Sequence, residues 1–284
     1  MTTPSPIVST DWLAANLSSP DLIVVDGSWY LPQMGRDADA EYLEGHIPGA
    51  IRFDIDEVSD PTSGLPHTLP APHVFASKMR RLGIGDGARI VVYDGIGLFS
   101  APRVWWMFKV MGVEDVYILD GGMRKWKAED RPLEDLPVKR PERHFTARLD
   151  TSALADINDV LKVVENGSAQ ILDARPAGRF TGEDPEPREG MRSGHMPGAH
   201  NLPFNQLMQE DGTIKSTDEI SNMIIDAGLD LTKPIITSCG SGVTAAALTL
   251  ALTLSGAKKL KLYDGSWSEW GSREDTPVAT GATE

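Results

Sequence analysis

Short apolar runs alternate along the chain with longer stretches in which polar and apolar residues are mixed. The clearest apolar runs lie at residues 22–26, 89–94, 170–173 and 234–239. Runs of this length bounded by loop residues predict buried strands, and the amphipathic stretches between them predict helices. Helix starts are marked by a capping box, S-T-D-E at residues 216–219, and by Pro102 in a first turn. The pattern predicts an α/β protein in which helices cover both faces of parallel sheets.

The chain contains the same sequence unit twice. The turn G-H-I-P-G-A at 45–50 recurs as G-H-M-P-G-A at 194–199, and D-G-G-M-R-K-W at 120–126 recurs as D-G-S-W-S-E-W at 264–270. The apolar runs recur in the same order. Residues 131–150, between the copies, are rich in proline and charge, as expected of a linker. We therefore predict two tandem domains, residues 1–135 and 151–284, joined by a linker at 136–150.

Composition is that of a soluble globular protein and excludes several classes of function. The 284 residues are 40% hydrophobic and 24% charged, with a net charge of −14. We expect binding to neither nucleic acid nor membrane, because the chain has no basic stripe and no apolar run of bilayer length. No signal peptide is indicated, so the expected location is cytoplasmic. The single cysteine excludes an intrachain disulfide and a cysteine-based zinc site.

That cysteine stands in the loop C-G-S-G-V-T, residues 239–244, between an apolar run and an alanine-rich stretch that predicts a helix. Two glycines allow the loop to turn its backbone N–H groups inward, where the positive end of the helix dipole also lies. This setting favours the thiolate, the nucleophilic form of cysteine. We predict that Cys239 is the nucleophile, although a single cysteine is more often an inert buried residue. Asp94 holds the same position in the first copy, so that copy is not expected to catalyse on its own.

The motifs together resemble those of the rhodanese family over nearly the whole chain. The tandem layout, the two H-x-P-G-A turns, the two D-G segments and the cysteine loop all fit. Gly240 and Ser241 are neutral, and thiosulfate-preferring relatives usually carry basic residues there, so the loop resembles the 3-mercaptopyruvate sulfurtransferase branch. The tract from G-R-F at 178–180 to P-E-P-R at 185–188, and F-D-I-D at 53–56 followed by His67, also match that branch.

The resemblance implies two rhodanese-like domains and a sulfur-transfer reaction. The Cys239 thiolate takes sulfur from 3-mercaptopyruvate as a persulfide, and pyruvate leaves as an enolate. A thiol, for example that of thioredoxin, or cyanide then accepts the outer sulfur. Neither a metal nor an organic cofactor is required. Because the chain has one cysteine, the acceptor must come from outside.

The resemblance also assigns roles to other residues. Arg179 and Arg188 would hold the carboxylate and carbonyl of the donor, since a guanidinium binds a carboxylate through two hydrogen bonds. Their spacing alone favours surface arginines paired with acidic neighbours, which are Glu183, Asp184, Glu186 and Glu189. A Ser–His–Asp relay of Ser241, His67 and Asp56 would move a proton; the alternative is that Ser241 and His67 are ordinary loop residues. The remaining residues expected to bind substrate are Gly240, Gly242, Val243 and Thr244.

Three other functions stay open from the sequence. Thiosulfate sulfurtransferase differs from the preferred interpretation only in its donor. A cysteine-dependent phosphatase or arsenate reductase needs an arginine at the end of its loop, where Thr244 stands here. A noncatalytic sulfur-binding module is the third, and the copy with Asp94 fits that description.

Overall fold

The computed structural model describes residues 5–282, which form two compact units. Unit 1 consists of the chain up to Asp60 together with Leu69–Asp150 and Met208–Ile214. Unit 2 consists of Pro61–Thr68, Thr151–Leu207 and the chain from Lys215 onward. Each half of the sequence therefore contributes one short segment to the other unit, which the repeat pattern did not indicate. The prediction about a signal peptide depends in part on residues 1–4. These residues lie outside the described residues.

Unit 1 is built on a parallel five-stranded sheet in the order β1-β5-β4-β2-β3. Its strands are β1 (Ile7–Val8), β2 (Leu22–Asp26), β3 (Ile51–Arg52), β4 (Arg89–Tyr93) and β5 (Val116–Leu119). Its helices are α1 (Thr10–Asn16), η1 (Pro32–Met34), α2 (Ala38–Glu44), α3 (Ile55–Val58), α4 (Pro72–Arg81), α5 (Ala101–Val110) and α6 (Gly122–Ala128). Every residue of β2 is buried, as expected for a parallel strand that is covered on both faces.

Unit 2 repeats this architecture with the strand order β6-β10-β9-β7-β8. Its strands are β6 (Leu154–Ala155), β7 (Gln170–Asp173), β8 (Ala199–Asn201), β9 (Ile235–Ser238) and β10 (Leu260–Tyr263). Its helices are η2 (Thr151–Ala153), α7 (Ile157–Asn166), α8 (Ala177–Thr181), η3 (Phe204–Leu207), α9 (Thr217–Asp226), α10 (Ala245–Leu254) and α11 (Ser266–Trp270). The prediction of two helix-covered parallel sheets is confirmed, and so is the capping box, at the start of α9.

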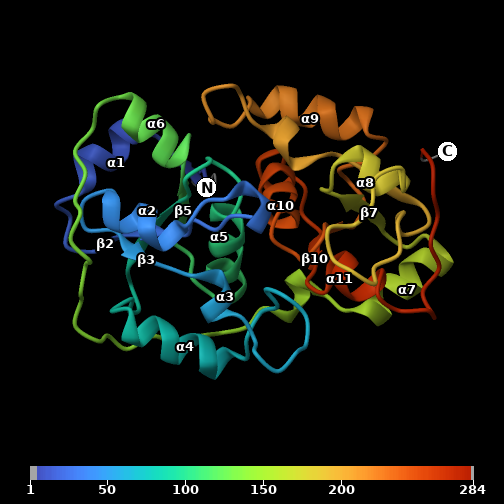
Figure 1. Cartoon of the computed structure of the whole chain (residues 1–284), viewed down its shortest axis with the longest axis horizontal. Coiled ribbons are helices and arrows are strands. Elements are labelled where there is room, and N and C mark those ends of the chain that lie inside the picture. The colour runs from blue at the N-terminus through green and yellow to red at the C-terminus, as the bar shows by residue number, and fades with distance from the viewer. Residues whose placement is uncertain (1–4, 283–284) are drawn as a thin grey trace. The chain divides into compact units, whose positions relative to one another are not determined.

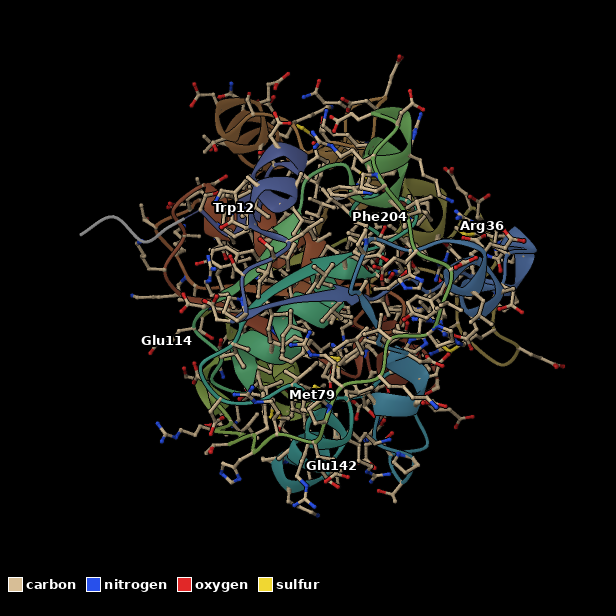
Figure 2. All side chains as sticks on the ribbon, turned by 90° about the vertical axis from the view of Figure 1, so that its left-hand side faces the viewer. Trp12, Arg36, Met79, Glu114, Glu142 and Phe204 are labelled. Carbon is tan, nitrogen blue, oxygen red and sulfur yellow. The ribbon has the colours of Figure 1, made fainter. Side chains whose placement is uncertain are left out.

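Helices cover the sheet of unit 1 from two sides, with α1 and α6 on one side and α4 on the other (Figure 1). On the first side, Leu13 of α1 and Trp126 of α6 pack with Val91 of β4 in one buried cluster. Met79 of α4 is fully buried, whereas Glu142 lies at the outer surface and pairs with Arg80 at 3.0 Å (Figure 2). The apolar sides of the helices therefore face the sheet, as the amphipathic pattern predicts.

The helix that follows the cysteine loop, α10, is buried along most of its length. Its first eight residues are all buried, because alanine, leucine and threonine occupy every side of the helix. On the opposite side of this sheet, Trp267 and Trp270 of α11 pack with Val160 of α7. The cysteine loop is thus attached to a rigid buried helix. Among residues 5–282, no helix is long and apolar enough to cross a membrane.

The two H-x-P-G-A turns are held in the same way. Nδ1 of His46 lies 2.8 Å from the carbonyl oxygen of Tyr42, and the two rings stack with centroids 4.0 Å apart. In unit 2, Nδ1 of His195 lies 2.9 Å from the carbonyl oxygen of Phe180, with centroids 3.9 Å apart. Both histidines thus join the turn to the helix before it, and their contacts serve the fold.

Candidate active site

Cys239 follows directly after β9, the middle strand of the sheet in unit 2. The loop that it begins ends at Thr244, the N-cap residue of α10. Gly242 adopts a φ of 79°, in the left-handed region, so the turn of the loop favours glycine at that position. Cys239 is buried, with 1% of its surface exposed. Open parallel sheets bind ligands at the carboxyl ends of their strands, and Cys239 has that position.

Two serines of α11 hold the backbone of the cysteine loop. Oγ of Ser266 accepts a hydrogen bond from the N–H of Cys239 at 3.2 Å. Ser268 donates to the carbonyl oxygen of Gly240 twice, from its N–H at 2.8 Å and from its hydroxyl at 2.6 Å. The sequence motifs did not single out either serine. A signal was present in the repeat, because the segment at 120–126 has glycine and arginine at the corresponding positions.

Asp94 has in unit 1 the place that Cys239 has in unit 2. It follows the middle strand β4, and its carbonyl oxygen accepts from the N–H of Met123 at 2.9 Å, as that of Cys239 does from Trp267 at 2.9 Å. The carboxylate of Asp94 fills its own loop. It accepts hydrogen bonds from five backbone N–H groups, those of Ile96 (2.8 Å), Gly97 (2.5 Å), Phe99 (2.9 Å), Ser100 (2.8 Å) and Ala101 (2.8 Å). The loop of unit 1 thus already holds an anion.

The two units also differ in the sign of a charged side chain near the loop that follows the middle strand. Arg179 precedes the aromatic residue that stacks on the turn histidine of unit 2, and Glu41 has that position in unit 1. Glu41 pairs with Arg36 at 2.6 Å and accepts from the Tyr30 hydroxyl at 2.7 Å. Burial and the Glu41 carboxylate raise the pKa of Tyr30, so the phenol remains a donor. Unit 1 therefore has a carboxylate at the position where unit 2 has an arginine.

Two of the three residues expected in the proton relay are in contact. Nδ1 of His67 lies 2.9 Å from Oγ of Ser241, and both residues are buried. This contact is possible because the segment Pro61–Thr68 belongs to unit 2. Asp56 belongs to unit 1, where its carboxylate accepts from Nε1–H of Trp29 at 2.8 Å. The role of Asp56 in a relay stays a prediction.

Both expected donor-binding arginines lie at the cysteine loop. A Cβ built on Gly240 would lie 3.2 Å from Nη2 of Arg179. Nη1 of Arg188 lies 3.2 Å from Oγ of Ser268, the serine that holds Gly240. Arg179 also pairs with one of its acidic neighbours, as its spacing alone favoured. Its Nε and Nη2 both donate to the carboxylate of Glu186.

The carboxylate of Glu186 bridges Arg179 to a second, fully buried arginine. Nη1 of Arg175 lies 2.7 Å from Oε1 of Glu186, and Arg175 also binds Asp173 through Nη2 at 2.7 Å. Burial lowers the pKa of Arg175, but the carboxylates of Asp173 and Glu186 outweigh it and raise the pKa. The guanidinium of Arg175 further lies over the ring of Trp267, 4.2 Å from its centroid. The sequence motifs did not single out Arg175, and they left Glu186 as one of four acidic neighbours of the two arginines.

The described part of the chain offers no group of three or more His, Cys, Asp or Glu side chains that could hold a metal ion. The chemistry that this arrangement supports is nucleophilic: a buried thiol beside two guanidinium groups and a hydroxyl–imidazole pair. The guanidinium groups can bind an anion, and the pair can move a proton.

Comparison with known proteins places both halves of the chain in one family. Residues 9–129 and 156–273 each match the family described as Rhodanese-like domain. The 3-mercaptopyruvate sulfurtransferase of Escherichia coli (strain K12) is 48% identical over 272 residues, which cover 95% of this chain and 96% of that protein. The thiosulfate sulfurtransferase of Bos taurus is 43% identical over 271 residues, 93% of this chain and 91% of that protein.

A solved structure shares the fold along nearly the whole chain. The crystal structure of SseA from Escherichia coli, described there among the 3-mercaptopyruvate sulfotransferases, superposes with a TM-score of 0.86 at 46% sequence identity. The match covers 93% of this chain and 99% of that chain.

Proposed function

Since the chain belongs to the rhodanese family in both of its halves, we propose that it is a 3-mercaptopyruvate sulfurtransferase with Cys239 as the sulfur carrier. The observation that carries the proposal is the position of Arg179 and Arg188 beside a cysteine loop that itself contains no basic residue. Such a loop suits a donor whose single carboxylate lies at a distance from the sulfur that is attacked. We also propose the cytoplasm as its location.

The reaction has two transfers. The Cys239 thiolate attacks the sulfur of 3-mercaptopyruvate, and a sulfur–sulfur bond forms while the carbon–sulfur bond breaks. The electrons of the broken bond leave on carbon as the enolate of pyruvate, which takes up a proton to give pyruvate. An external thiol, such as that of thioredoxin, or cyanide then attacks the outer sulfur and restores the Cys239 thiolate. The backbone N–H groups of Gly240, Gly242, Val243 and Thr244 would stabilise the negative charge in the loop.

The Ser241–His67 pair would supply the proton that the enolate needs. Oγ of Ser241 lies two residues along the loop from the nucleophile, and its contact with His67 at 2.9 Å gives it a partner for proton exchange. Asp56 would complete the relay by orienting the imidazole. The loop itself contains no basic residue, so this pair is the group in the loop that can supply the proton.

Arg179 and Arg188 would hold the carboxylate and carbonyl of the donor. Among the described residues, Nη1 of Arg179 has no hydrogen-bond partner, so it is the group left to donate to a ligand. We expect Arg179→Ala to lower kcat/KM for 3-mercaptopyruvate roughly thirtyfold, because loss of a charge-assisted hydrogen bond costs about 2 kcal/mol. Arg179→Lys should also impair binding, since lysine keeps the charge but loses the fork. Steady-state kinetics measure both effects.

A matched control for these variants is Arg273→Lys, which changes an exposed arginine that pairs with Asp275. It should leave kcat/KM unchanged. Wild-type kinetics in the double variant Arg179→Ala/Arg188→Ala would contradict the assignment of the two arginines.

Thiosulfate sulfurtransferase is the alternative function, and it is not favoured, because the bovine enzyme of that name is less similar to this chain than the 3-mercaptopyruvate sulfurtransferase of Escherichia coli. Thiosulfate is a dianion, and its attack and the departure of sulfite both call for positive charge next to the cysteine. Gly240 and Ser241 provide none, and a side chain at position 240 would meet Arg179.

The experiment that separates the two donors is a side-by-side steady-state comparison with the wild-type protein. We expect kcat/KM for 3-mercaptopyruvate to exceed that for thiosulfate at least tenfold, equivalent to about 1.4 kcal/mol in transition-state binding. A larger value for thiosulfate would replace the first function by the second. Absence of turnover with both donors would indicate a noncatalytic sulfur-binding protein.

A further inference from the structure

Unit 1 has an arginine in the place that Arg179 occupies in unit 2. A Cβ built on Gly95 would lie 3.0 Å from Nη2 of Arg36. A Cβ built on Gly240 would lie 3.2 Å from Nη2 of Arg179. Gly95 and Gly240 are equivalent, because each comes directly after the first residue of the loop that follows the middle strand. A guanidinium group therefore lies beside the same point of the loop in both units.

Both arginines are held by a glutamate in the same way. Arg36 donates to the carboxylate of Glu41 through Nε at 2.7 Å and through Nη2 at 2.6 Å, and Arg179 donates to Glu186 through the same two nitrogen atoms. The ends of the pair are exchanged, because the helix supplies the glutamate in unit 1, from α2, and the arginine in unit 2, from α8. Among residues 5–282, Nη1 of Arg36 has no hydrogen-bond partner, so it can donate to a ligand as Nη1 of Arg179 can.

A second guanidinium group also has a counterpart in unit 1. In unit 2, Nη1 of Arg188 lies 3.2 Å from Oγ of Ser268 on α11. In unit 1, Arg124 of α6 stands at the position of Ser268 in the repeated D-G segment. The side chain of Arg124 is exposed, and within the described part of the chain its guanidinium group has no hydrogen-bond or ion-pair partner. The helix α6 thus supplies directly the kind of group that a loop brings to Ser268 in unit 2.

These side chains line one cavity of unit 1. The cavity has a volume of about 290 Å³ and lies at the carboxyl ends of β2 and β4, where Asp26 and Gly95 form part of its wall. Open parallel sheets bind ligands at this edge. A single water molecule needs about 15 Å³ of cavity, so there is room for a carboxylic acid of a few carbon atoms. The charged residues of the wall are three cations and two carboxylates, which are Arg36, Arg124, Lys127, Asp26 and Glu41.

The two carboxylates of the wall already have partners. Glu41 binds Nε and Nη2 of Arg36 and accepts from the hydroxyl of Tyr30. Asp26 is 3% exposed and accepts from the N–H of Ser28 at 2.9 Å. Burial of these acids is thus compensated within the protein, and the groups left to receive a ligand are donors.

From this geometry we propose that unit 1 has a second binding site, which takes a small 2-oxo acid such as pyruvate. Nη1 of Arg36 and the guanidinium group of Arg124 hold its carboxylate and carbonyl, the role that Arg179 and Arg188 have in the proposed function. The class of ligand rests on that function. The site binds without catalysis, because the Asp94 carboxylate already accepts from five N–H groups of the loop and the single cysteine of the chain lies in unit 2.

The test is a titration of the ¹⁵N-labelled full chain with pyruvate, followed by NMR. The amide signal of Gly95 reports binding in unit 1, and that of Gly240 reports binding in unit 2. We expect both signals to shift and to saturate. Arg124→Ala should weaken the binding that Gly95 reports about tenfold, because a charge-assisted hydrogen bond is lost, and should leave the Gly240 titration unchanged. The variant should keep its fold, since the guanidinium group of Arg124 has no partner to lose.

Arg81→Ala is the matched control, because Arg81 is an exposed arginine of the same unit and does not line the cavity. Both of its titrations should equal those of wild type. A Gly95 signal that does not shift, or a Gly95 titration that is unchanged in Arg124→Ala, would overturn the second site. Sulfate that binds there as tightly as pyruvate would overturn its assignment to a 2-oxo acid. Failure of wild-type protein to turn over 3-mercaptopyruvate would overturn the proposed function instead, and the Gly95 titration would still decide whether unit 1 binds pyruvate.

Discussion

Cys239→Ser should abolish sulfur transfer. Wild-type protein incubated with 3-mercaptopyruvate and no acceptor should gain the mass of one sulfur atom, whereas the variant should gain none. The reason is chemical: a serine hydroxyl is a far weaker nucleophile than a thiolate and forms no persulfide. Intact-protein mass spectrometry detects the adduct, and pyruvate release in the presence of cyanide measures turnover.

The variant should also keep the fold, because serine differs from cysteine by one atom and the hydrogen bonds of Cys239 to Ser266 and Trp267 are made through its backbone groups. Its thermal unfolding should stay close to that of wild type. Turnover retained in Cys239→Ser would rule out a covalent carrier at this position, and a second sulfur in the wild-type adduct would show that the carrier holds more than one atom.

Asp94→Ala should cause the largest loss of stability among the changes considered. The substitution leaves five backbone N–H groups of unit 1 without their acceptor, in a loop where Asp94 is 1% exposed. Buried donors left unpaired cost about 1–3 kcal/mol each before water or local rearrangement compensates, so we expect a fall of roughly 3–5 kcal/mol in the free energy of unfolding. Denaturant unfolding of the full chain measures it.

The matched variant is Asp94→Asn, which keeps one oxygen acceptor and should lose less stability than Asp94→Ala. Asp94→Cys in a Cys239→Ser background should show no sulfur transfer, because Ile96 stands in this loop where Ser241 stands in unit 2, so the loop has no hydroxyl to pair with an imidazole. A free energy of unfolding within about 1 kcal/mol of wild type in Asp94→Ala would mean that the five hydrogen bonds do not stabilise the loop.

The fold could be predicted from the sequence because its signals are local and occur twice. The apolar run at 22–26 became β2 without change, and the run at 234–239 became β9 with Cys239 directly after it. Pro102 marked the first turn of α5. Local signals of this kind depend on a few neighbouring residues, so tertiary packing had little to add to them.

The candidate site could be predicted only in part, because its contacts join residues that are far apart in the chain. The spacing of Arg179 and Arg188 left four acidic partners open, and only the fold selects Glu186. Ser268 could have been found by comparing the two copies, whereas the contact between His67 and Ser241 spans 174 residues. No local pattern carries that information.

The exchange of short segments between the two units has a consequence for how such a protein can be divided. A cut in the chain at residue 150 would leave Ser241 on one fragment and His67 on the other. The same cut would remove Ile214, whose N–H donates to Asp120 at 2.8 Å, from the fragment that carries unit 1. Each fragment, expressed alone, would therefore lack a segment of its own compact unit that the other fragment contains.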